Sequence, residues 1–300
     1  MSVTSSVTRK LRISAIQYLN PAPLMWDFEH APEQNRLAER YEIHATLPAQ
    51  CADELAAGRA DIGLVPAAAY ATTPGLAVIS GCAIASLDHV RSILLVMRQP
   101  NGMRSLRCIA ADPASRSSNV YAQVILREFY GAVPEFVPRA TNLAGNLDAM
   151  LADCDAAVLI GDPALLALED RAARANRTGE QLEYIDLAHE WKQHTGLPWV
   201  SAFWAARPEA IRASGLSAAE VTGDFQRSRD HGMAHLEEIV AEWTPRLIGP
   251  PAVPPAVIRA YLKNNIHYTL DDNCLAGLGL FYRYAAELGV LPPAPPLRFV

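Results

Sequence analysis

The five cysteines of this chain form no closely spaced pair. Cys51, Cys82, Cys108, Cys154 and Cys274 are scattered singly along the 300 residues. Zinc ribbons and disulfide scaffolds need clustered cysteines, so we expect neither as the basis of the fold. An odd number of isolated cysteines is typical of reduced, buried thiols, which we expect here.

Clusters of basic residues are missing as well. No run of Lys and Arg exceeds two residues, and the formal net charge is −6. Nucleic-acid-binding proteins concentrate positive charge on one face, so we expect no nucleic-acid partner. A local pocket can be positive in an acidic protein, and a small anionic substrate is therefore compatible with this charge.

Long apolar segments are also lacking. Residues 1–10 are polar, and the apolar run that follows, Leu11–Ile16, is too short for a signal peptide or a membrane span. We expect a flexible leader over residues 1–10, no membrane contact and a cytoplasmic protein. Its sequence fits a monomer and a homodimer equally well.

Strand-like and helical patterns alternate over much of the chain. Half of the residues are apolar and 19% are charged, which is typical of a globular protein. Apolar runs in the first third predict strands over residues 11–16, 41–47, 60–66, 76–84 and 90–97. Because helical patterns separate several of these strands, we expect an α/β fold with a largely parallel sheet.

The pattern starts again after a polar segment at residues 98–107. Strands are expected at 108–112, 135–138, 156–162 and 183–186, a return crossing at 190–204, and helices after Arg207. This layout predicts a clamshell in which residues 11–98 and 200–300 form lobe one and residues 99–199 form lobe two. The helical C-terminal segment is expected to pack on lobe one. Ligands of clamshell proteins lie in the cleft between the lobes.

Three loops at predicted strand ends are candidate walls of this cleft: Gln17–Pro23, Pro113–Asn119 and Gly161–Asp162. In the first loop, Asn20 carries a donor and an acceptor, and it either faces a ligand or simply caps the loop. In the second, Ser115, Ser117 and Ser118 lie ahead of an amphipathic helix. Hydroxyls and free N–H groups at a helix N-terminus coordinate carboxylates or phosphates, although an ordinary N-cap explains the same residues.

Two further polar residues have a functional and a structural interpretation. Ser92 interrupts an apolar strand, so it either reaches the cleft or is a buried hydroxyl with a backbone partner. Asp162 either binds a substrate hydroxyl or caps the helix predicted over residues 163–168. The residues alone do not decide between these interpretations.

Motifs for metals, nucleotides and hydrolases are weak or missing. His231 and His235 have i, i+4 spacing but no third ligand in view. Gly277-Leu278-Gly279 lacks the third glycine and the preceding strand of a dinucleotide fingerprint, and neither a Walker loop nor a G-x-S-x-G elbow occurs. His89, near a predicted strand end of lobe one, is either a general base or a surface residue.

Motifs along nearly the whole chain resemble the chorismate dehydratases of the futalosine route to menaquinone. The matching segments, in the order of that family, are Ile16–Leu24, Asp61–Pro66, Val90–Leu95, Asp112 with Ser115–Ser118, Leu159–Asp162, Trp191 with Thr195–Pro198, Tyr261-Leu262, and Gly277-Leu278 with Phe281. The family often has Ser-x-Thr-Ser where this chain has Ser117, a change that keeps the hydroxyl. It usually has Phe-Val-Phe where this chain has Trp199-Val200-Ser201, a change that would reshape the pocket wall.

The resemblance implies a type II periplasmic-binding-protein fold turned to catalysis, with no metal and no organic cofactor. It implies that chorismate, a dicarboxylate, loses water to give 3-[(1-carboxyvinyl)oxy]benzoate, driven by aromatisation of the ring. In the mechanism proposed for the family, a carboxylate of the substrate itself takes the proton, so the protein contributes positioning and charge stabilisation. The motif positions imply that Asn20 and Ser92 are catalytic. They assign substrate binding to Ser115, Ser117, Ser118, Asp162 and Thr195.

Two other functions are weighed against this one. The first is that of the related 1,4-dihydroxy-6-naphthoate synthases, which rely on a catalytic histidine in the cleft, where this chain offers only a poorly placed His89. The second is a non-catalytic small-anion binding module, which would bind its ligand without turnover.

Overall fold

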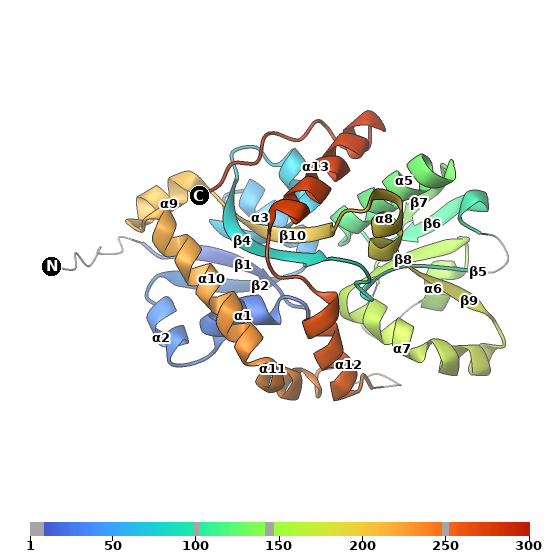
Figure 1. Ribbon diagram of the computed structural model, residues 1–300, viewed down its shortest axis with the longest axis horizontal. Coiled ribbons are helices and arrows are strands. Elements are labelled where there is room, and N and C mark those ends of the chain that lie inside the picture. Colours follow the sequence, from blue (N-terminus) through green and yellow to red (C-terminus); the bar gives the residue numbers. More distant parts are fainter. Residues whose placement is uncertain (1–8, 99–101, 142–146, 248–251) are drawn as a thin grey trace.

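Two five-stranded sheets organise the molecule (Figure 1), whose computed structural model describes residues 9–98, 102–141, 147–247 and 252–300. The first sheet has the order β2-β1-β3-β10-β4, with β1 (Leu11–Ile16), β2 (Tyr41–Thr46), β3 (Ile62–Pro66), β4 (Ala77–Ser86) and β10 (Trp199–Ala206). In it β1 is parallel to β2 and β3, whereas β10 is antiparallel to β3 and β4. Residues 1–8 of the expected leader lie outside the described residues.

The second sheet has the order β7-β6-β8-β5-β9. Its strands are β5 (Ile93–Arg98), β6 (Cys108–Ala111), β7 (Glu135–Pro138), β8 (Ala156–Ile160) and β9 (Leu182–Asp186). Here β6 is parallel to β7 and β8, and β5 is antiparallel to β8 and β9. Each sheet with its helices forms one lobe, so the α/β architecture of two lobes predicted from the sequence is confirmed.

Helices flank both sheets. Lobe one has α1 (Ala22–Glu29), α2 (Glu33–Leu37), α3 (Pro48–Ala56), α4 (Ala67–Thr72), and the C-terminal α9 (Pro208–Ser214), α10 (Ala218–Ala234), α11 (Leu236–Trp243), α12 (Pro255–Ala260), the π-helix η2 (Tyr261–Asn265) and α13 (Asp272–Glu287). Lobe two has the short 3-10 helix η1 (Met103–Ser105), α5 (Arg116–Tyr130), α6 (Leu147–Leu151), α7 (Gly161–Thr178) and α8 (Leu187–Thr195). None of the described helices has the length and apolarity that a membrane span requires.

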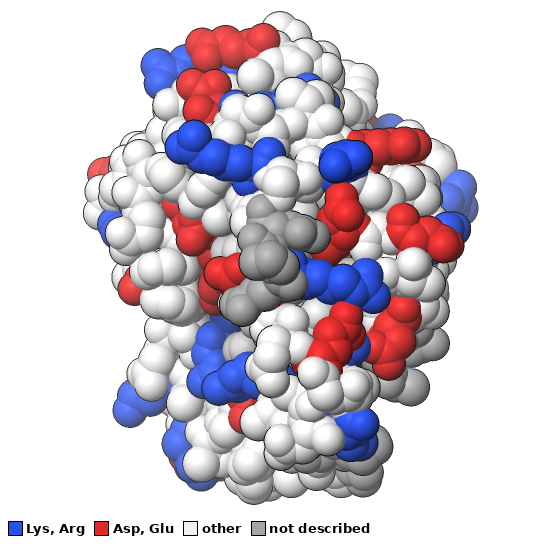
Figure 2. Space-filling view, turned by 90° about the vertical axis from the view of Figure 1, so that its right-hand side faces the viewer, with Lys and Arg blue, Asp and Glu red and all other residues white. Residues whose placement is uncertain are grey.

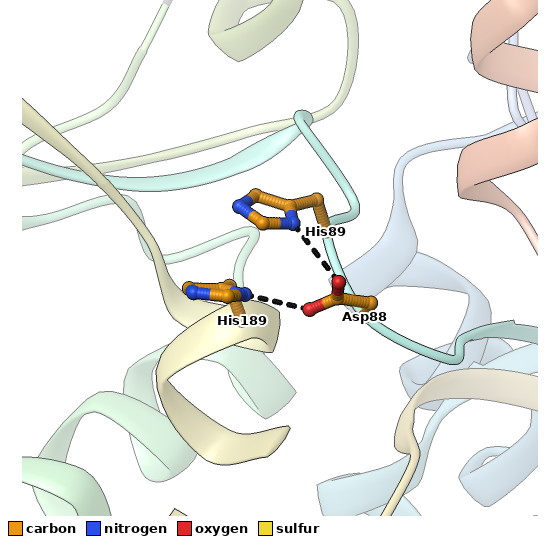
Figure 3. Close-up of side chains that lie close together, drawn as sticks. All are labelled: Asp88, His89 and His189. Carbon is orange, nitrogen blue, oxygen red and sulfur yellow. Dashed lines mark hydrogen bonds and ion pairs between the residues drawn. The ribbon is translucent and has the colours of Figure 1, made fainter. Parts of the chain in front are cut away.

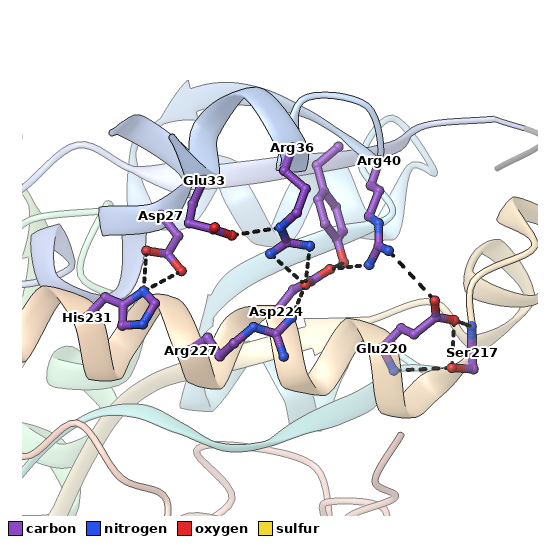
Figure 4. Close-up of polar contacts among 10 residues, drawn as sticks. Asp27, Glu33, Arg36, Arg40, Ser217, Glu220, Asp224, Arg227 and His231 are labelled. Atoms are coloured by element: carbon purple, nitrogen blue, oxygen red, sulfur yellow. Dashed lines mark hydrogen bonds and ion pairs between the residues drawn. The ribbon is translucent and has the colours of Figure 1, made fainter. Parts of the chain in front are cut away.

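A buried carboxylate fixes the C-terminal helices on lobe one, as Figure 4 shows. Asp224 of α10 is fully buried. It accepts hydrogen bonds from the Tyr41 hydroxyl at 2.9 Å and from the guanidinium groups of Arg36 and Arg40 at 3.2 and 3.0 Å. Helix α10 packs against α1 and β4, whereas α13 packs against β10, α4 and also α5 of lobe two. The C-terminal segment therefore packs on lobe one, as expected, and reaches across to lobe two.

The first crossing between the lobes lies earlier than the sequence predicted. Residues 93–98 were assigned to lobe one, but β5 pairs with β8 and β9 in the second sheet. The chain crosses at residues 87–92, where Arg91 has a φ of 63°. The strand run is apolar and buried on both faces, so its pattern fits the centre of either sheet.

The predicted return crossing at residues 190–204 is also wrong in part. Residues 199–206 form β10, which lies inside the first sheet between β3 and β4. Only the segment between α8 and β10 crosses. A strand that is apolar on both faces apart from one serine gives no period-two alternation, so the pattern does not reveal this strand.

The expectation of five reduced thiols is wrong for one pair. Cys108 and Cys154 form a disulfide, while Cys51, Cys82 and Cys274 are free and buried. The two bonded cysteines are 46 residues apart, and only the pairing of β6 with β8 brings them together. Sequence spacing could not reveal this contact.

Charges of both signs are interspersed on the face of lobe two shown in Figure 2, which is the right-hand end of Figure 1. Blue Lys and Arg side chains alternate there with red Asp and Glu side chains. Among the described residues of this face, no continuous positive surface of the kind that attracts nucleic acid is visible.

Four buried aromatic side chains pack together where the two lobes meet. Tyr121 of α5 stacks between Trp199 of β10 and Phe281 of α13, with ring centroids 3.7 and 3.9 Å away. Trp191 of α8 meets Tyr121 edge-on at 5.0 Å. The Tyr121 hydroxyl accepts the backbone N–H of Val200 at 3.3 Å. The Tyr121 ring of lobe two thus packs between two aromatic rings of lobe one.

This stack predicts a large stability difference between two substitutions at one position. Tyr121→Ala removes the whole ring and should lower the free energy of unfolding by about 3–5 kcal/mol. Tyr121→Phe keeps the stacking and removes one hydrogen bond, so it should lower that free energy by only about 1 kcal/mol. Urea unfolding followed by tryptophan fluorescence measures both, and equal losses would refute the role of the stack.

Candidate active site

A pocket lies between the lobes, where the ends of strands from both sheets meet. Its polar lining comes from the loop after β1, the crossing before β5, the start of α5 and the middle of β10. These residues are Tyr18, Asn20, Ser92, Ser115, Arg116, Ser117, Ser118 and Ser201. The structure therefore brings together five of the seven predicted site residues, namely Asn20, Ser92, Ser115, Ser117 and Ser118.

Asn20 presents an unsatisfied acceptor on the lobe-one side of the pocket. Its main-chain carbonyl accepts a hydrogen bond from the Tyr268 hydroxyl at 2.9 Å, which fixes the backbone of the loop. Its side-chain Oδ1 is buried and has no hydrogen-bond partner. A buried polar atom is nearly always paired in a native structure, so this one indicates a group that the pocket receives.

The start of α5 provides the opposite wall. Ser115 occupies the N-cap position, yet its side chain makes no capping hydrogen bond, and its buried Oγ has no partner. The free N–H groups of the first turn and the positive end of the helix dipole lie beside it. This arrangement suits a carboxylate.

Ser117 and Ser118 are both buried and line the pocket. Ser117 donates to the carbonyl of Ser201 at 2.9 Å and accepts the backbone N–H of Ala68 at 3.2 Å. Its hydroxyl is thus occupied in joining α5 to β10 and α4 of the other lobe.

Ser92 is supported by Tyr261, a residue that the sequence places in a family motif but not in the predicted site. It is almost fully buried in the crossing segment, and its Oγ accepts a hydrogen bond from the Tyr261 hydroxyl at 2.8 Å. Burial holds the pKa of Tyr261 well above its usual range, so the phenol stays a donor. Tyr261 belongs to the π-helix η2, an irregularity that often occurs at functional sites.

Tyr18 forms the wall between this pocket and a larger neighbouring cavity. Its ring packs so closely on Gly161 that a Cβ at that glycine would lie 2.8 Å from the ring. Gly161 also has a φ of +63°, which favours glycine. Burial raises the pKa of Tyr18 to about 12. The sequence signal for this contact is the glycine at the end of a predicted strand.

Asp162 lies in the neighbouring cavity with Gln17, Glu29 and Arg246, and it does not line the pocket of Asn20 and Ser92. Its Oδ1 accepts the backbone N–H of Leu19 at 3.0 Å, which links the two lobes. Burial raises the pKa of Asp162 to about 7, against a smaller opposing effect of that hydrogen bond.

Thr195 is not brought to either cavity. Its hydroxyl donates to the carbonyl of Trp191 at 2.7 Å and accepts the N–H of Leu197 at 3.2 Å. These contacts close the last turn of α8, so the predicted binding residue caps a helix here. The next residue, Gly196, takes the left-handed conformation that ends this helix, and a glycine at this place is the sequence signal of a helix end.

The histidine pair on α10 does not converge on a common point. His231 Nδ1 lies 2.8 Å from Asp27 Oδ1, while His235 Nδ1 donates to the carbonyl of His231 and its ring stacks on Trp26. Both rings are thus engaged in fixing α10 and the residue after it against α1.

Comparisons with known proteins give a consistent result. A family model described as menaquinone biosynthesis matches residues 11–287. A chorismate dehydratase from Thermus thermophilus is 30% identical, over 86% of this chain and 90% of that protein. Among solved structures, the protein AF1704 from Archaeoglobus fulgidus has a TM-score of 0.70 at 15% identity, covering 95% of this chain and 99% of that one. The aliphatic sulphonate binding protein SsuA from Escherichia coli has a TM-score of 0.63 at 16% identity, covering 95% and 94%.

These structural neighbours establish the fold as that of the periplasmic binding proteins, as the sequence predicted. A further similar chain, from Candida albicans, carries the generic form of this fold, with a TM-score of 0.63 at 14% identity over 96% and 92% of the two chains.

The burial of Asp162 predicts a pH-dependent stability. Its carboxyl is protonated in the folded chain up to about pH 7, whereas in the unfolded chain it releases its proton near pH 4. Its protonated form therefore stabilises the fold below about pH 4, and this contribution is lost as the pH rises to 7. Relative to Asp162→Asn, the wild type should lose up to about 4 kcal/mol between these values.

Urea unfolding of both proteins at several pH values measures this difference. Asp153→Asn, which changes an exposed carboxylate, is the matched control and should follow the wild type. Parallel pH profiles for the wild type and Asp162→Asn would contradict the prediction.

Proposed function

The chain belongs to the menaquinone biosynthesis family, and from this premise we propose that it is a chorismate dehydratase, a carbon–oxygen lyase. It would convert chorismate to 3-[(1-carboxyvinyl)oxy]benzoate and water, the first step of the futalosine route, in the cytoplasm. The observation that carries this proposal is the pair of buried, unpartnered polar atoms in the interlobe pocket, Asn20 Oδ1 and Ser115 Oγ. The relative from Thermus thermophilus supports it, because that protein is a chorismate dehydratase.

Chorismate has two carboxylates, and the start of α5 offers a place for one of them. The Oγ of Ser115 has no partner, Ser118 lines the same pocket, and the N–H groups of the first turn point out of the helix end. Ser117 contributes by holding α5 against lobe one and has no free hydroxyl for the ligand. We therefore assign carboxylate binding to Ser115, Ser118 and the backbone beside them.

Asn20 and Ser92 then face the reacting part of the substrate. In the reaction, the bond between the ring and its hydroxyl oxygen breaks, a proton leaves the neighbouring ring carbon, and the electron pair of that C–H bond completes the aromatic ring. The departing hydroxyl takes up a proton and leaves as water. The amide of Asn20 and the hydroxyl of Ser92 are neutral hydrogen-bonding groups, suited to orienting and stabilising this hydroxyl.

No strong base from the protein is assigned to this step. Among the described residues, those that line the pocket include no histidine and no carboxylate. A carboxylate of the substrate itself would accept the ring proton, and pass it on to the departing hydroxyl. The same lining disfavours a reaction that depends on a cleft histidine, such as that of the 1,4-dihydroxy-6-naphthoate synthases.

Incubation of the purified protein with chorismate tests the proposal. Ultraviolet absorbance should change as the diene becomes aromatic, and mass analysis should detect a product lighter by one water. Asn20→Ala and Ser92→Ala should each lower kcat/KM by about a hundredfold or more, because each removes a group that acts on the departing hydroxyl. Asn35→Ala, at an exposed position of α2, is the matched control and should be fully active.

Two results would contradict the assignment in different ways. Tight binding of chorismate without turnover would favour the anion-binding module. Full turnover in both Asn20→Ala and Ser92→Ala would leave the activity standing and remove these residues from the site.

The contact between Tyr261 and Ser92 generates a second prediction. Tyr261→Phe removes the hydroxyl that holds Ser92 Oγ and keeps the ring, so kcat should fall about tenfold with little change in KM. Tyr282→Phe is the matched control, since it removes another buried hydroxyl, which donates to the carbonyl of Ala67.

Both variants should lose about 1 kcal/mol of stability, but only Tyr261→Phe should lose activity. In a Ser92→Ala background, Tyr261→Phe should have no further effect on kcat, because it acts through Ser92. Equal kcat values for Tyr261→Phe and Tyr282→Phe in the wild-type background would refute the positioning role.

A further inference from the structure

A cluster of two histidines and one aspartate lies at the first crossing between the lobes (Figure 3). Asp88 and His89 belong to the crossing segment 87–92, and His189 belongs to the first turn of α8 in lobe two. Asp88 Oδ1 lies 2.6 Å from His189 Nδ1, and Asp88 Oδ2 lies 3.3 Å from His89 Nδ1. The candidate ligand atoms of all three side chains lie within 4.8 Å of one another.

The backbone that carries these side chains is held in place independently of them. The carboxylate of Asp186 accepts the N–H of Arg91 at 2.6 Å on one oxygen, and the N–H groups of Ala188 and His189 on the other. One partly buried carboxylate thus joins the crossing segment to the start of α8. On the other side, Asn265 Nδ2 donates to the carbonyl of His89 at 3.0 Å. The three side chains are therefore presented by a fixed frame.

The side chains themselves are open to solvent. The exposed fractions are 56% for Asp88, 51% for His89 and 30% for His189. The two imidazoles stack with centroids 3.8 Å apart, and Figure 3 shows a nitrogen of each ring directed at the same carboxylate. An ion at this point could therefore enter from solvent and complete its coordination with water.

Two imidazole nitrogens and one carboxylate oxygen are ligands of divalent transition metals, whereas Mg²⁺ and Ca²⁺ prefer sites made of oxygen alone. We propose that Asp88, His89 and His189 bind a divalent transition-metal ion, with Zn²⁺ as the probe. Metal–ligand bonds of about 2.0–2.2 Å place the ligand atoms about 3–4 Å from one another. Rotation of these exposed side chains brings their ligand atoms to that spacing.

The ion links the crossing segment to α8, so its binding stabilises the arrangement of the lobes that the structure shows. A second group, His267, Asp271 and Cys274, is less suited to this role. The Oδ1 of Asp271 accepts the N–H of Cys274, and its Oδ2 contacts His267. Cys274 is fully buried, and burial raises the pKa of its thiol to about 12.

Calorimetric titration of the full chain with Zn²⁺, after removal of bound metal with a chelator, tests the proposal. We expect one equivalent to bind in the wild type. His89→Ala and His189→Ala should each weaken binding by about a hundredfold, since loss of even an outer-sphere partner weakens metal binding by about 10–100-fold. His44→Ala removes an exposed histidine that lies 3.6 Å from Glu42, and it should leave the affinity unchanged.

Two further measurements distinguish this site from others. Zn²⁺ should raise the melting temperature of the wild type and of His44→Ala but not that of His189→Ala. The absorption spectrum of the Co²⁺ form should lack a thiolate charge-transfer band, which binding at Cys274 would produce. Wild-type Zn²⁺ affinity in both His89→Ala and His189→Ala, or a thiolate band, would overturn the proposal. No chorismate is present, so the result is independent of the proposed activity.

Discussion

The stack of Tyr121 between Trp199 and Phe281 is the contact on which the arrangement of the lobes depends. It places a ring from lobe two between a strand and a helix of lobe one, where dispersion and the hydrophobic effect act together. Because α5 carries Tyr121 and also begins at Ser115, the same helix sets the position of the pocket wall. The geometry of the pocket thus depends on aromatic packing between the lobes.

Polar contacts between the lobes then select one arrangement of the lobes. Ser117 joins α5 to the backbone of Ser201 and Ala68, and Asp162 accepts the N–H of Leu19. Each of these bonds is worth only about 1 kcal/mol, but each requires a particular distance between the lobes. Apolar packing supplies most of the energy that holds the lobes together, and these directional contacts fix the position of one lobe relative to the other. Ser117, although it belongs to a cleft motif, therefore serves to fix the position of the lobes and has no free hydroxyl for a ligand.

Sequence patterns were sufficient for many local elements and for five residues of the pocket lining, but not for the contacts between distant segments. Periodicity and strand-end loops located β1 and the start of α5, and with them Asn20 and Ser115. Periodicity could not assign β5 or reveal β10, because strands buried on both faces look alike in any sheet. The support of Ser92 by Tyr261 and the pairing of Cys108 with Cys154 arise only when the sheets form. For Thr195 the resemblance implied substrate binding, whereas its hydroxyl is used at the end of a helix.

The chemistry of the pocket follows from the lack of carboxylates and imidazoles among its described lining residues. Asp162 lines the adjoining cavity, and the cation of the lining, Arg116, forms an ion pair with Asp53. Within the pocket, the lining offers an amide, hydroxyls and the end of a helix, groups that stabilise charge without exchanging protons at neutral pH. Such a site suits an elimination in which the substrate brings its own base and aromatisation provides the driving force. A protein carboxylate beside the reacting carbons would instead repel the carboxylates of the substrate, and would raise the barrier to their binding.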